Sequence, residues 1–159
     1  MMNANNLPKF ALGGALLLAA VIAVAWWFPA EHATAKEIVV YKSPTCGCCT
    51  KWADHMRANG FKVTTKEVND LGAVKVRYGV AQHLSSCHTA LIDGYVVEGH
   101  VPADVVERML RERPKIAGIA VPGMPQGSPG MEQGMPPEHY DVVAFDGQGG
   151  TTVYIIVTP

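Results

Sequence analysis

The stretch Tyr41-Lys-Ser-Pro-Thr-Cys-Gly-Cys-Cys49 decides the fold, because it places three cysteines between a strand and a helix. Residues 37–41 are β-branched and aromatic and predict a buried strand. Residues 50–59 predict a helix that the following glycine ends. We therefore expect the three cysteines to lie together at the N-terminus of a helix.

Strand and helix patterns continue outward from this junction. Residues 118–137 are rich in Gly, Pro and Met and predict no regular element. The sequence predicts an α/β fold, a mixed sheet with flanking helices that is extended by a C-terminal β-hairpin. The remaining predicted elements are strands over residues 61–68, 89–92, 95–98, 140–145 and 151–157, and helices over residues 71–78 and 103–113.

Residues 1–35 have the order of a secretory signal peptide or an N-terminal membrane anchor. Residues 10–28 are apolar, and Ala33-Thr34-Ala35 supplies a pattern of small residues for cleavage. The apolar run is also long enough to span a bilayer, so the sequence leaves cleavage and anchoring open. Both place residues 36–159 outside the cytoplasm, and we expect one periplasmic domain there.

The charge balance excludes one class of partner. The chain of 159 residues has 13 Lys and Arg against 14 Asp and Glu, a formal net charge of −1. This composition offers no basic surface for nucleic acid, which we do not expect as a partner. Contact with a membrane is expected only if the N-terminal segment is retained.

Two landmarks resemble the thioredoxin–glutaredoxin fold. The first is the strand that leads into the cysteine cluster, and the second is Ser86-Cys-His-Thr-Ala-Leu-Ile-Asp-Gly94. In glutaredoxins the matching stretch carries a cis-proline, and His88 takes that position here. Because this loop faces the cysteine motif in that fold, the resemblance implies that Cys87 and His88 lie beside the other three cysteines.

The mature chain more specifically resembles the CopG-like family of exported copper-resistance proteins. The residues that carry this resemblance are Tyr41–Cys49, Cys87-His-Thr-Ala90, Gly99-His-Val-Pro102, Gly123-Met-Pro125 and Gly127-Ser-Pro-Gly-Met131. The resemblance implies a thioredoxin-like fold in which the Cys-x-Cys-Cys motif and the fourth cysteine hold copper. It also implies several copper ions in a cluster and a role in copper redox chemistry.

The donor set agrees with copper(I). The chain has four cysteines, Cys46, Cys48, Cys49 and Cys87, and copper(I) prefers thiolate and thioether ligands. Adjacent cysteines bridge two ions more easily than they chelate one, which favours a multinuclear thiolate cluster. We expect the helix N-terminus and Lys42 to lower the pKa values of the thiols.

Three other interpretations stay open at this point. A set of Cys₄ or Cys₃His ligands also suits zinc, although zinc sites usually use two separated cysteine pairs. Cys46 and Cys49 form a Cys-x-x-Cys pair that suits a thiol–disulfide oxidoreductase. The third is an anchored module that two disulfides stabilise and that binds no metal.

Further candidate ligands lie outside the cysteines. We expect His88 and then His100 to serve as auxiliary copper ligands, and at least one methionine of the Gly- and Pro-rich loop, Met124 first, to approach the copper. On the helix that follows the motif, Trp52 is predicted in the core and His55 on the surface. The expected partners are copper ions and other periplasmic copper-handling proteins.

Overall fold

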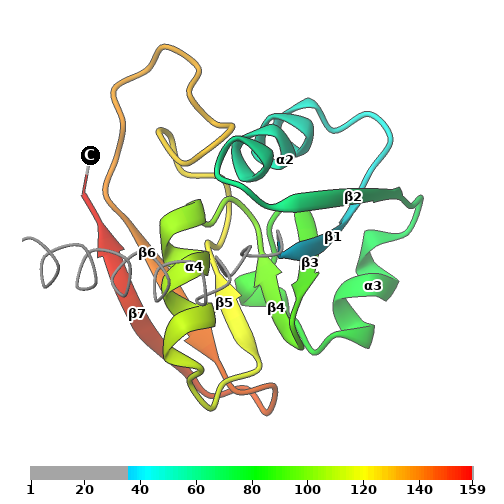
Figure 1. The fold of residues 1–159 in the computed structure, drawn as a ribbon, viewed down its shortest axis with the longest axis vertical. Coiled ribbons are helices and arrows are strands. Elements are labelled where there is room, and N and C mark those ends of the chain that lie inside the picture. Colours follow the sequence, from blue (N-terminus) through cyan, green and yellow to red (C-terminus); the bar gives the residue numbers. More distant parts are fainter. Residues whose placement is uncertain (1–35, 159) are drawn as a thin grey trace, which may run out of the picture. The chain divides into compact units, whose positions relative to one another are not determined.

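The computed structural model describes residues 36–158 of the chain. One sheet runs through it in the order β2-β1-β3-β4-β5-β6-β7 (Figure 1). Its strands are β1 (Glu37–Lys42), β2 (Lys62–Glu67), β3 (His88–Ile92), β4 (Tyr95–Glu98), β5 (Gly118–Ala120), β6 (Tyr140–Phe145) and β7 (Thr151–Val157). The helices are α2 (Gly47–Ala58), α3 (Leu71–Arg77), α4 (Ala103–Glu112) and a short 3₁₀ helix, η1 (Gln82–Leu84).

The sheet is mixed, which confirms the predicted α/β class. β1 pairs with β2, and β4 with β5, in parallel, while the other neighbouring strands are antiparallel. β6 and β7 form the predicted C-terminal hairpin, with an irregularity between Val142 and Val143. The assignment to the thioredoxin-like group stays a prediction.

Helices cover the sheet on both faces. α2 and α4 share the larger core with one face of the central strands, and Figure 1 shows α4 in front of β5 and β6. Val96 and Val97 on β4 belong to different cores because neighbouring side chains of a strand point to opposite faces. The buried α4 residues are Ala103, Val105, Val106, Met109 and Leu110, the last four as their helical spacing predicts, and Trp52 of α2 is also buried.

β5 corrects the prediction that residues 118–137 contain no regular element. The strand is three residues long and lies between β4 and β6. A Cβ at Gly118 would lie 2.1 Å from the carbonyl oxygen of Val96, so only glycine allows β4 to approach this closely. Glycine in a sequence usually argues against a strand. Here the lack of a side chain at Gly118 allows the close contact with β4, so the tertiary contact makes this segment a strand.

The predicted signal peptide or anchor, residues 1–35, lies outside the described residues. Within residues 36–158, no helix combines the length and the apolar character needed to cross a membrane.

Candidate metal centre

Three cysteines surround the first turn of α2. Cys46 is the residue before the helix, and α2 begins at Gly47, three residues earlier than predicted. Cys48 and Cys49 therefore lie inside its first turn. A disulfide joins Cys46 to Cys49, and the Cys48 sulfur lies 3.4 Å from that of Cys46. We call Cys46, Cys48 and Cys49 the helix half of the site.

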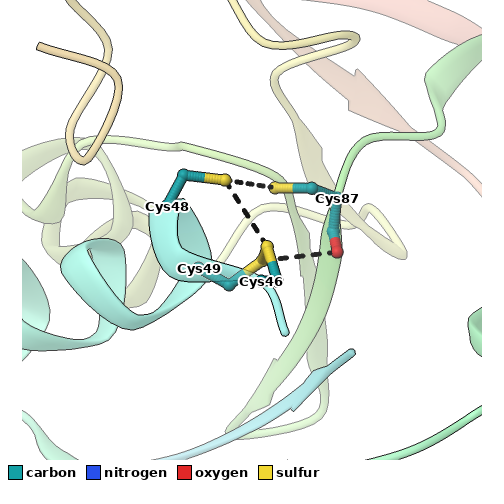
Figure 2. A group of neighbouring side chains, drawn as sticks. All are labelled: Cys46, Cys48, Cys49 and Cys87. Carbon is teal, nitrogen blue, oxygen red and sulfur yellow. Dashed lines mark hydrogen bonds between the residues drawn. A yellow bond between two sulfur atoms is a disulfide. The ribbon is translucent and has the colours of Figure 1, made fainter. Parts of the chain in front are cut away.

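Sheet pairing brings the fourth cysteine to this helix. His88 at the start of β3 pairs with Lys42 at the end of β1, so Cys87 lies next to the turn that leads into α2. The Cys87 sulfur is 3.8 Å from that of Cys48, and its carbonyl oxygen is 3.5 Å from the Cys49 sulfur (Figure 2). All four sulfurs lie within 4.8 Å of one another. The juxtaposition that the family resemblance implied is present.

Two histidines lie against Cys87. The Cys87 sulfur is 2.8 Å from Nε2 of His100 and 3.4 Å from Nδ1 of His88. Both imidazoles are fully buried, and their rings meet edge to face with centroids 5.1 Å apart. The Trp52 ring packs against His88 with centroids 4.4 Å apart. We call Cys87, His88 and His100 the sheet half of the site.

A backbone carbonyl sets the tautomer of His100. Nδ1 of His100 lies 2.7 Å from the Pro129 carbonyl oxygen, which only accepts, so Nδ1 carries the hydrogen. In the neutral ring, Nε2 then presents a lone pair toward the Cys87 sulfur. An imidazole held by a carbonyl through one nitrogen, with the other nitrogen available, is typical of metal-binding histidines.

Burial controls the protonation of the sheet half. It holds the pKa of His88 well below 6.5, with the charges of His100 and Lys75 adding to the effect, and it also lowers the pKa of His100. Neutral imidazoles result, as metal ligation requires. Burial and the neighbouring Cys48 raise the pKa of Cys87 to about 12, which corrects the expectation of lowered thiol pKa values for this cysteine.

Lys42, which was expected to act on the thiols, has other partners. Its ammonium donates to the carbonyl oxygen of Ser43 and lies 3.4 Å from the carboxylate of Glu67. The buried Lys42 side chain thus links the end of β1 to the end of β2, and its charge is paired with the Glu67 carboxylate. The sequence placed a cation near the motif, but only the fold shows which group it pairs with.

The Gly-, Pro- and Met-rich loop contacts both halves. Ser86 donates to the carbonyl oxygen of Gly123, Pro129 accepts from His100, and Gly130 packs on the backbone of Cys48. The Pro129 carbonyl was missed by sequence reasoning because a backbone acceptor has no sequence signal. Met124 follows Gly123 directly and is 51% exposed, and its role as a ligand stays a prediction.

His55 corrects another expectation. It is half-buried rather than on the surface, and its Nε2 accepts a hydrogen bond of 3.1 Å from the backbone of Ala103. His55 therefore joins α2 to the first residue of α4. No pattern in the sequence distinguishes such a histidine from a solvated one, because its partner is a backbone amide of another element.

The donor set fits a soft metal ion. The four sulfur atoms form one group, and Cys87 forms a second group with two neutral imidazoles. Nε2 of His88 is buried without a hydrogen-bond partner among the described residues. A buried nitrogen without a partner costs free energy unless a ligand uses it. With the disulfide reduced, all four sulfurs become available as ligands, and a metal ion would displace the proton of the Cys87 thiol on binding. Fold and site thus define an α/β protein with a cysteine-rich candidate metal centre.

Comparison with known proteins gives the family. A solved structure titled "Copper resistance protein copG- Form 2" is 48% identical, with a TM-score of 0.74 over 78% of this chain and 99% of that one. "Copper resistance protein copG- Form 1" is 47% identical, with a TM-score of 0.73 over 79% and 99%. This chain belongs to the CopG family of copper resistance proteins. The family described as "Protein of unknown function, DUF411" matches residues 84–131, and no curated protein matches.

Proposed function

We propose that this protein binds copper(I) in the periplasm, as part of copper resistance, through Cys46, Cys48, Cys49 and Cys87. The observation that carries the proposal is the convergence of four sulfurs from two distant segments, in a chain that belongs to the CopG family. Thiolates are preferred ligands of copper(I). His88 and His100 supply neutral nitrogen ligands at the buried side, and Met124 supplies a thioether at the exposed side.

The proposed ligands hold more than one ion. Cys48 and Cys49 are adjacent, so their sulfurs bridge neighbouring ions rather than chelate one. Four thiolates balance the charge of up to four copper(I) ions. The bound copper is cargo, held until another periplasmic copper-handling protein accepts it. The proposed role includes interconversion of copper(I) and copper(II), in which an external redox partner takes or gives the electron.

Titration of the reduced, purified protein with copper(I) against a competing chelator tests the proposal. We expect more than one copper per chain. Cys87→Ser should weaken binding by more than the roughly 10- to 100-fold typical of changes around a metal site, because it removes a ligand. His139→Ala changes an exposed histidine and is the matched control. Equal affinities for the two variants would contradict the proposed site.

A specific observation also supports a second function, thiol–disulfide exchange. Cys46 and Cys49 are joined, and the free sulfur of Cys48 lies within 3.4 Å of the Cys46 sulfur. An oxidoreductase would cycle this disulfide with a substrate dithiol and would bind copper weakly. Catalysed oxidation of a dithiol substrate, with an added small disulfide as the oxidant, by a protein that binds no copper would favour this function over copper binding.

A further inference from the structure

A buried carboxylate lies behind the sheet half of the site. Glu98 ends β4 and is fully buried. Its Oε1 accepts a hydrogen bond of 2.6 Å from the backbone N–H of Ser86, and its Oε2 accepts one of 2.7 Å from the Thr89 hydroxyl. Its charge is paired with Lys75 of α3, which also donates to Thr89.

The two hydrogen-bond partners of this carboxylate bracket Cys87 and His88. Ser86 directly precedes Cys87, and Thr89 directly follows His88. One rigid group therefore holds both ends of a four-residue segment whose two middle residues are proposed ligands. Because the Cys87 loop enters the sheet only at β3, these contacts fix how it approaches α2.

Glu98 is also close in the sequence to His100, the third residue of the sheet half. One residue, Gly99, separates Glu98 from His100, and its N–H donates to the carbonyl oxygen of His88. Gly99 has a φ of +72°, and a Cβ there would lie 2.5 Å from the Ser86 hydroxyl oxygen. Glycine thus lets Ser86 pass close to the end of β4. The two chain segments that carry Cys87, His88 and His100 therefore meet at Glu98.

The pair of Glu98 and Lys75 supplies a hydrogen-bond acceptor that apolar side chains lack. A buried ion pair usually adds little stability over well-packed apolar side chains, since both charges lose their hydration. An apolar pair, however, would leave the Ser86 N–H without an acceptor. We propose that Glu98, neutralised by Lys75, is the positioning residue that holds Cys87, His88 and His100 in their metal-binding arrangement. This inference rests on the proposed copper function.

Glu98→Ala in the full chain tests the inference with two readouts. The first is copper(I) affinity in chelator competition, which should fall by about 10-fold or more, as for other groups that orient metal ligands. The second is the alkylation rate of Cys87 in the reduced, metal-free protein, followed by peptide mass spectrometry. This rate should rise because the loop loses both of its anchors.

Two further variants separate positioning from general destabilisation. Val106→Ala creates a cavity in the larger core, on the face of the sheet opposite the Glu98 side chain, and should lower the unfolding temperature with little change in either readout. The double variant Lys75→Met, Glu98→Gln removes both charges and keeps an acceptor for Ser86. It should recover part of the affinity, and it carries the test if Glu98→Ala does not fold.

The outcomes are distinct. Unchanged affinity and unchanged Cys87 alkylation in Glu98→Ala would overturn the inference, and so would equal effects in Val106→Ala. If the unmodified protein binds no copper(I), the proposed function fails. The alkylation rate then still decides whether Glu98 positions the Cys87 loop.

Discussion

The helix half and the sheet half of the site are built in opposite ways. The helix half comes from one turn of α2, so its three sulfurs are close together in the sequence as well as in space. The sheet half comes from the ends of β3 and β4, and it exists only when these strands pair. Local geometry thus supplies three of the four sulfur atoms, and tertiary structure supplies the fourth and the buried nitrogens.

Burial divides the candidate ligands in a different way. Cys46, Cys48 and Cys87 are partly exposed, whereas Cys49, His88 and His100 are fully buried. A partly exposed sulfur can receive an ion from solvent or from a partner. A buried imidazole stays neutral because burial disfavours its charged form. The comparison teaches that ion entry and ligand protonation are controlled by different parts of the fold.

Removal of a nitrogen from the sheet half should have the largest effect among the tests of this comparison. His100→Ala deletes the imidazole that lies 2.8 Å from the Cys87 sulfur. We expect copper(I) affinity to fall about 10- to 100-fold in chelator competition. His83→Ala, at an exposed position of η1, is the control. Equal affinities in both variants would mean that the helix half and Cys87 suffice.

A substitution that pushes the Gly-, Pro- and Met-rich loop away from the helix half should lower the stability of the protein moderately. Gly130 has a φ of +89°, and a Cβ there would lie 2.8 Å from the carbonyl oxygen of Cys48 and 3.0 Å from the backbone nitrogen of Trp52. Gly130→Ala should therefore lower the free energy of unfolding by about 1–3 kcal/mol, measured by urea denaturation.

Gly134→Ala is the matched control for this change. Gly134 has a φ of +77° in the same loop, and a Cβ there meets no atom within 4 Å. It carries the backbone strain without the contact, so the difference between the two variants measures the crowding against α2. If both variants lose the same stability, the loop does not depend on its packing against the helix half.

The smallest expected effect concerns the pH dependence of stability. Burial lowers the pKa of His55 against the opposing charges of Glu132 and Asp104, so the folded protein prefers the neutral ring. The unfolded chain binds more protons between the lowered pKa and 6.5, and stability should fall as the pH drops through that window. His55→Gln should weaken this dependence in thermal unfolding, whereas the exposed His139→Gln should not. A steeper dependence in His55→Gln would contradict the assignment.

Much of the fold follows from local patterns. The junction of strand, cysteines and helix, the hairpin of β3 and β4, and the buried stripe of α4 all depend on residues that are close in sequence. β5 was missed because its three residues become a strand only between β4 and β6. Glu98 was missed because a lone glutamate at a strand end has no signal of burial or of pairing with Lys75.

The sequence by itself determined the α/β class and the three cysteines at one helix N-terminus, because periodicity and spacing act over a few residues. Only the tertiary structure decided which charge faces Lys42, how Pro129 orients His100, and that burial raises rather than lowers the pKa of Cys87. These features depend on groups far apart in the chain. Their energies come from desolvation and close contact, which exist only after the strands and helices have packed.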